Sequence, residues 1–139
     1  HKKYPHLDYE NGITLGSMLQ NISKIGDFVD KNTIIVPGKG ALANALDLIN
    51  YQKVMTKIVK QLVTMIKNGD TLETVLAKKS ITNNLDSRGF GDGSVTTEMF
   101  LTSLYEELTY ELGPVDTRSP EERAMERLKE MQKNKENKN

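Results

Sequence analysis

Apolar residues recur at helical spacing along much of the chain, and each such stretch predicts an amphipathic helix. The first stretch covers residues 15–29 and follows Thr14, which is a suitable N-cap residue. The second covers about residues 47–67, and the Asn68-Gly69 pair after it is typical of a helix C-terminus. These two long helices are the largest elements that the pattern predicts.

A third apolar face joins residues 100–112, with Ser94 or Thr96 as its N-cap and Gly113-Pro114 as its stop. Beyond this stop the chain turns polar. The segment Ser-Pro-Glu-Glu at 119–122 is typical of a helix start, but the sequence then ends in Lys, Glu and Asn residues. We therefore predict one domain, residues 1–113, and a charged tail, residues 114–139, that is partly helical and partly disordered.

The region between the second and third helices is less regular. Asp70, followed by Glu73 three residues later, resembles a capping box and predicts a shorter helix that ends at Lys79. Residues 81–94 show no sustained period and are rich in glycine, so we expect a loop anchored by Phe90.

One short stretch has the pattern of a strand. Residues 33–36, Thr-Ile-Ile-Val, are β-branched throughout, which predicts a fully buried strand. Pro37 ends it by removing a backbone donor, and Gly38 and Gly40 favour a tight loop around Lys39. Loops that follow a buried strand commonly carry function, so we take these four loop residues as the candidate site.

Composition narrows the functional classes. Of 139 residues 37% are hydrophobic and the mean hydropathy is −0.52, so the core is small or shared with another unit. Nineteen basic residues balance nineteen acidic ones, which argues against a global attraction to nucleic acid. No apolar run is long enough to span a bilayer and no apolar signal core is present, so we expect a soluble protein of unknown location. Because the first residue is His1 rather than methionine, the start is a candidate truncation.

Metal ligands are sparse. The chain has no cysteine, which excludes disulfides and thiolate zinc sites. His1, His6, Asp8 and Glu10 lie in an N-terminal segment that shows no sustained helical period. We interpret them as solvated loop residues.

Two interpretations of Lys39 follow from its neighbours alone. A phosphate-binding P-loop requires glycine where Thr33 stands and serine or threonine where Gly40 stands, so this motif fails at both positions. A catalytic lysine with a lowered pKa is the second interpretation, and no nearby residue supports it.

A third interpretation comes from resemblance. The loop of Pro37, Gly38, Lys39 and Gly40, together with the helix after it, resembles the C-terminal half of the metallo-β-lactamase superfamily, in its cyclase-like branch. The resemblance covers residues 4–112 and rests on the order and spacing of several segments, which are YPHLD at 4–8, ANALDL at 43–48, NGDTLE at 68–73, VLAKK at 75–79 and RGFG at 88–91.

This resemblance implies an α/β fold, namely one half of an αββα sandwich, with the fragment mostly helical and holding about one to three short strands. The family uses zinc, and its loop is Pro-Gly-His-Gly with the histidine as a ligand, so Lys39 stands at a ligand position. The family's HxHxDH motif is absent. Because an ammonium group has no lone pair, we expect no catalytic residue, no bound zinc and no hydrolysis in this chain.

The implied partner is a missing N-terminal half of the same domain, or a second copy of the chain, with no nucleic acid and no membrane span. The leading functional hypothesis is a segment of a zinc-dependent hydrolase that is inactive by itself. The alternatives are a catalytically dead binding module and a plain helical interaction domain with chance resemblance.

Overall fold

The computed structural model describes residues 3–38 and 41–114, together with the isolated positions 122, 124–126, 129 and 133. Within this part the chain is mostly helical. The α-helices are α1 (Leu15–Gly26), α2 (Ala45–Lys67), α3 (Leu72–Ala77), α4 (Asn83–Asp86) and α5 (Thr97–Leu112), and the short 3-10 helices are η1 (Tyr9–Asn11), η2 (Lys79–Ile81) and η3 (Phe90–Asp92).

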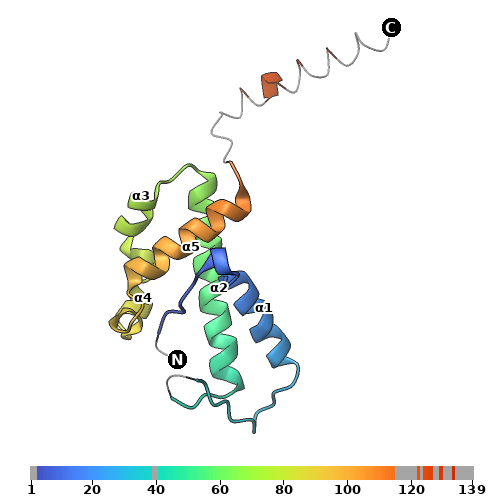
Figure 1. Ribbon diagram of the computed structural model, residues 1–139, viewed down its shortest axis with the longest axis vertical. Coiled ribbons are helices and arrows are strands. Elements are labelled where there is room, and N and C mark those ends of the chain that lie inside the picture. The colour runs from blue at the N-terminus through green and yellow to red at the C-terminus, as the bar shows by residue number, and fades with distance from the viewer. Residues whose placement is uncertain are drawn as a thin grey trace.

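The long helix α2 is the centre of the arrangement. Helix α1 lies along its N-terminal half and α5 crosses its C-terminal half, while α3 packs on α5 (Figure 1). The side chains between these helices are apolar and almost fully buried, and the largest of them are Leu15, Met55, Leu62, Ile66, Val75, Phe100 and Leu104. The core is therefore shared by all the longer helices, and no sheet takes part in it.

The ends of the helices follow local sequence. Thr14 caps α1 and Thr96 caps α5, each by accepting a hydrogen bond from a backbone N–H three residues later. Asn44 and Asp47 form a reciprocal capping box at the start of α2. Gly113 ends α5 with a positive φ of 68°, a conformation that favours glycine.

The predicted cap of the short helix is wrong by one residue. Thr71, and not Asp70, is the N-cap of α3, and its hydroxyl accepts a hydrogen bond from the N–H of Thr74. The helix also ends at Ala77, before Lys79. The region after it was expected to be irregular but holds three short helical turns, which Phe90 anchors as predicted with only 3% of its surface exposed.

The predicted strand and the sandwich half are wrong for the described residues. Residues 33–36 form no ladder, because Ile35 makes only a single antiparallel bridge to Ala43. A second isolated bridge joins Asp8 to Ile13. Two isolated bridges are not a sheet. With no neighbouring strand to cover it, the β-branched run is not buried, and Ile34 and Val36 are 69% and 77% exposed.

The charged tail beyond residue 114 lies outside the described residues, apart from the isolated positions named above. Over the part of the chain that is described, no helix is both long enough and apolar enough to cross a membrane.

Candidate functional site

The candidate loop follows a short extended segment at one end of the molecule. The N–H of Ile35 donates to the carbonyl oxygen of Ala43 at 2.7 Å, and the N–H of Ala43 donates back at 2.9 Å. This pair closes the loop that carries the predicted site. Pro37 is half-buried and Gly38 is exposed, whereas Lys39 and Gly40 lie outside the described residues. That Lys39 stands at the position of the family's zinc-ligand histidine therefore stays a prediction.

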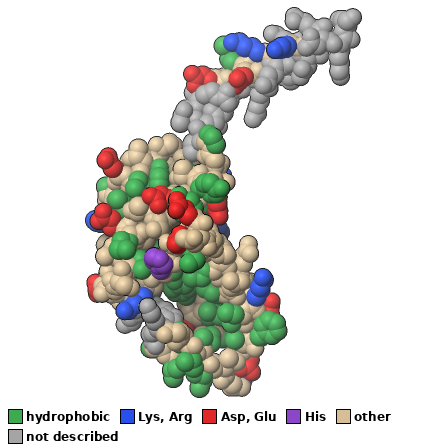
Figure 2. All heavy atoms as spheres, in the orientation of Figure 1, with side chains coloured by type: hydrophobic (Ala, Val, Ile, Leu, Met, Phe, Trp, Pro, Cys, Tyr) green, Lys and Arg blue, Asp and Glu red, His purple; other side chains and the backbone are tan. Residues whose placement is uncertain are grey.

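A group of large apolar side chains surrounds this loop, and we call it the apolar end. It comprises Ile25, Phe28, Ile34, Val36, Leu42, Leu46 and Ile49, each at least 44% exposed. Hydrophobic side chains gather over this half of the molecule, around the α1–α2 connection (Figure 2). Such contiguous exposure is unusual for a surface that faces only water.

The backbone at the apolar end also has free hydrogen-bonding groups. In the described part of the chain, the N–H and C=O groups of Ile34 and Val36 make no hydrogen bond, since the bridge to Ala43 uses only those of Ile35. The free groups alternate with the bridged ones along the segment, as on the open edge of a strand. Both the side chains and the backbone of this segment are thus unpartnered.

The described residues do not fit a zinc site. They include no group of three or more His, Cys, Asp or Glu side chains placed to hold a metal ion. Asp8 instead caps η1: its carboxylate accepts from the backbone N–H of Asn11 at 3.3 Å and from the side-chain amide of Asn11 at 2.8 Å. His1 lies outside the described residues. A three-ligand zinc centre would need donors that this part of the chain does not bring together.

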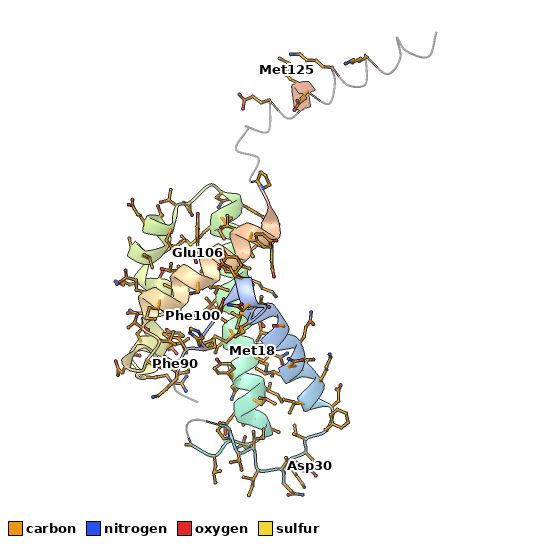
Figure 3. All side chains as sticks on the ribbon, viewed as in Figure 1. Met18, Asp30, Phe90, Phe100, Glu106 and Met125 are labelled. Atoms are coloured by element: carbon orange, nitrogen blue, oxygen red, sulfur yellow. The ribbon has the colours of Figure 1, made fainter. Side chains whose placement is uncertain are left out.

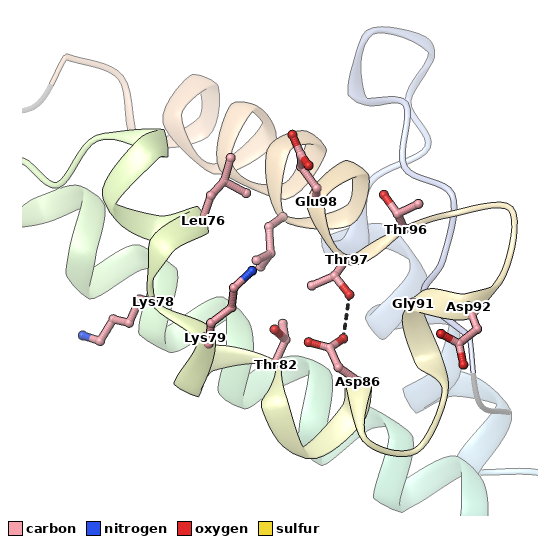
Figure 4. Close-up of a pocket in the computed structure, with 11 residues that line it drawn as sticks. Leu76, Lys78, Lys79, Thr82, Asp86, Gly91, Asp92, Thr96, Thr97 and Glu98 are labelled. Atoms are coloured by element: carbon pink, nitrogen blue, oxygen red, sulfur yellow. Dashed lines mark hydrogen bonds between the residues drawn. The ribbon is translucent and has the colours of Figure 1, made fainter.

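A cavity of about 370 Å³ lies between α4, η3 and the start of α5, far along the chain from the candidate loop. Asp86 is its central group (Figure 4). The Thr97 hydroxyl donates to Oδ1 of Asp86 at 2.6 Å, and the Tyr4 hydroxyl donates to the same oxygen at 2.7 Å. Asp86 thereby joins the N-terminal segment, α4 and α5.

The charge state of Asp86 follows from these contacts. Burial by itself raises the pKa of the carboxyl, but hydrogen bonds from Thr97 and Tyr4 and the charge of Lys79 outweigh burial and hold the pKa below its ordinary value. Burial and the same carboxylate raise the pKa of the Tyr4 hydroxyl. Asp86 is therefore an ionised acceptor that fixes structure, and the Tyr4 hydroxyl stays protonated as its donor.

The ring of Tyr4 reinforces this junction. It stacks on Phe100 with a centroid distance of 4.4 Å and meets Phe90 edge-on at 5.5 Å. Phe90 and Phe100 lie on η3 and α5, where the N-terminal segment passes them (Figure 3). Tyr4, the first of residues 4–8 on which the family resemblance rests, thus holds the N-terminal segment to the helical core.

One buried carboxylate was missed by the sequence analysis. Glu107 lies on α5 with 2% of its surface exposed, and it accepts hydrogen bonds from the backbone N–H groups of Leu15 at 2.9 Å and Gly16 at 3.2 Å. It therefore satisfies two donors at the start of α1. A signal existed in the sequence, because residue 107 follows Leu104 by three positions and falls on the apolar face of its helix.

Comparison with known proteins identifies no relative. No protein-family model, no curated protein sequence and no solved structure matches this chain.

Proposed function

We propose that this chain is a non-catalytic docking segment of a hydrolase from the metallo-β-lactamase superfamily. Its role is to pack the apolar end on the remainder of the enzyme. The observation that carries the proposal is the segment at Ile34 and Val36, whose apolar side chains are exposed and whose backbone groups are unpaired.

The chemistry of this surface favours a β-strand as the occupant. An extended partner would use the free N–H and C=O groups of Ile34 and Val36 for main-chain hydrogen bonds, and its side chains would cover the apolar ones. A helix or an irregular loop would leave those backbone groups unsatisfied in a buried interface, which is costly. The partner that fits is the edge of a sheet.

The family resemblance supports the same partner. The Pro-Gly-Lys-Gly loop directly follows the open segment, and the proposed partner is a missing N-terminal half of the same enzyme. That half would also supply the zinc ligands, since the described residues of this chain do not offer a set. In its absence, a second copy of this chain would occupy part of the surface.

Mutation of the open segment tests the docking role. The isolated chain is expected to self-associate and to bind a hydrophobic dye, because the apolar end is uncovered. The double variant Ile34→Lys/Val36→Lys is expected to be monomeric and to bind several-fold less dye. Sedimentation velocity and dye fluorescence measure both effects.

The matched control is Met99→Lys, which changes an exposed apolar residue of α5 outside the apolar end. Self-association and dye binding of this variant should stay within about 20% of the values for the unmodified chain, because a single exposed apolar residue contributes little to either. A monomeric wild-type chain that binds no dye, or an equal effect of Met99→Lys, would contradict the proposal.

The second candidate function is a catalytically dead binding module, and zinc content separates it from a hydrolase segment. If the chain is a hydrolase segment, we expect the polypeptide of the whole reading frame to contain HxHxDH. We also expect the number of zinc ions bound per polypeptide to rise in the variant Lys39→His, because a histidine ligand would replace an ammonium group that repels a divalent ion. Metal analysis of both polypeptides measures this. A reading frame without HxHxDH favours the dead module, and unchanged zinc in a complete ligand set shows that Lys39 is not at the ligand position.

A further inference from the structure

A second cavity, of about 360 Å³, lies against the C-terminal half of α2, away from the apolar end. Residues of α2 form one wall, and the turn after α2, Lys78 and the end of η2 complete it. Its polar lining consists of Lys57, Lys60, Gln61, Thr64, Asn68, Asp70 and Lys78. Nothing in the sequence motifs pointed to this place.

The cavity is positively charged although the chain as a whole is neutral. Three lysines and one aspartate line it, which gives a net charge of +2. Within the described part of the chain none of the ammonium groups of these lysines forms an ion pair or a hydrogen bond. Concentrated positive charge without an acidic partner is the arrangement found in anion sites.

The lysines come from two different elements. Lys57 and Lys60 are three residues apart on α2 and so lie on one face of that helix. Lys78 approaches from the end of α3, and its ammonium group points in the opposite direction to that of Lys79, which enters the Asp86 cavity (Figure 4). Exposed lysines from two elements therefore line one cavity because of tertiary packing, and they are not a run along the sequence.

Two neutral donors add to the charge. The side-chain amides of Gln61 and Asn68 line the same cavity, and no hydrogen bond to either amide occurs among the described residues. The Thr64 hydroxyl is different, since it already donates to the carbonyl oxygen of Lys60 at 2.9 Å. The cavity thus offers three ammonium groups and two amides that have no acceptor among the described residues.

We propose that this cavity binds a small molecule bearing a phosphate group. A single carboxylate would neutralise only one of the lysines, whereas a phosphate or diphosphate carries two or more charges and several acceptor oxygens. Lysine binds such groups as a point charge that needs no fixed geometry. Asp70, the one acidic group in the lining, would receive a hydroxyl or amino group elsewhere on the ligand.

Titration of the full chain with inorganic pyrophosphate, followed by ¹H–¹⁵N NMR at constant ionic strength, tests the proposal. Shifts are expected to concentrate in residues 57–81. The double variant Lys57→Gln/Lys60→Gln should weaken binding at least tenfold, and Lys24→Gln/Lys53→Gln, which removes the same charge outside the cavity, less than twofold. Asp70→Asn should tighten binding by a few-fold, because it removes a repulsive charge, and a purely structural role would not produce that.

A second arm identifies the source of the phosphate. Binding of pyrophosphate in solution supports a soluble phosphorylated ligand. Binding only to vesicles of phosphatidylcholine that contain a phosphorylated inositol lipid supports a lipid headgroup, provided that Lys57→Gln/Lys60→Gln abolishes it. The absence of binding in both arms, or an equal loss in the two double variants, overturns the proposal.

Discussion

Replacing Phe100 with alanine is expected to destabilise the fold by about 3–5 kcal/mol, the usual cost of emptying a buried phenylalanine site. Phe100 is 1% exposed and stacks on Tyr4, so its removal opens a cavity at the junction of α5 with the N-terminal segment. Urea denaturation of the full chain, followed by far-ultraviolet circular dichroism, measures the change.

The control for this change is the neighbouring Met99→Ala. Met99 is 49% exposed, and its truncation is expected to cost less than about 1 kcal/mol, as for surface substitutions in general. Similar losses of stability in Met99→Ala and Phe100→Ala would show that Phe100 does not lie on the buried face of α5.

The second large effect is expected at Glu107. Glu107→Ala removes the acceptor of two backbone N–H groups, those of Leu15 and Gly16, and should destabilise the chain by about 2–4 kcal/mol, because buried donors without partners are costly. Glu106→Ala, at an exposed position next to it, should cost less than about 0.5 kcal/mol. Chemical denaturation at neutral pH compares the two.

Glu107 also gives the stability a pH dependence. Burial raises the pKa of its carboxyl above the ordinary value of 4.5, and the charge of Glu111 adds to this, although the two N–H donors oppose it. The folded chain therefore binds this proton more tightly than the unfolded chain does. The contribution is fully present below pH 4.5 and is lost as the pH rises through the raised pKa.

The variant Glu107→Gln cannot titrate, so its free energy of unfolding should lack the decline above pH 4.5 that the wild type shows. Glu106→Gln should keep the decline. Asp86 acts in the opposite sense, because its pKa is lowered, and its stabilisation is lost as the pH falls below 3.8. A wild-type profile that rises from pH 4.5 to 7 would contradict the account of Glu107.

The helices could be predicted because their signals are local. Thr14 and Thr96 act within a few residues of themselves and begin α1 and α5 where the sequence indicated, and Gly113 ends α5 in the same way. The Asn68-Gly69 pair does the same for α2, where Gly69 adopts a φ of +84°. Periodicity of apolar residues then located the face of α2 that is buried.

The errors arose where a residue's state depends on distant partners. A β-branched run such as Ile34 to Val36 predicts a strand only if other strands are present to pair with it, and none is among the described residues. Phe28 was placed on the apolar stripe of the first helix, but α1 ends at Gly26 and Phe28 is 88% exposed. Tertiary packing decided both outcomes.

The functional groups were harder to predict for the same reason. The lysines of the α2 cavity come from α2 and from the end of α3, and Glu107 meets α1 across more than ninety residues of sequence. Spacing along the chain carries no information about such contacts. The candidate loop could be proposed from the sequence because its residues are contiguous.

Amide hydrogen exchange at Ile34 and Val36 tests the central claim most directly. In the isolated chain both amides should exchange rapidly, since neither is hydrogen-bonded. When the proposed N-terminal half is joined to the chain, both should be protected at least a hundredfold, while Ile35 changes less because its N–H already bonds to Ala43. Rapid exchange of Ile34 and Val36 in both polypeptides would contradict the claim that a strand docks on this edge.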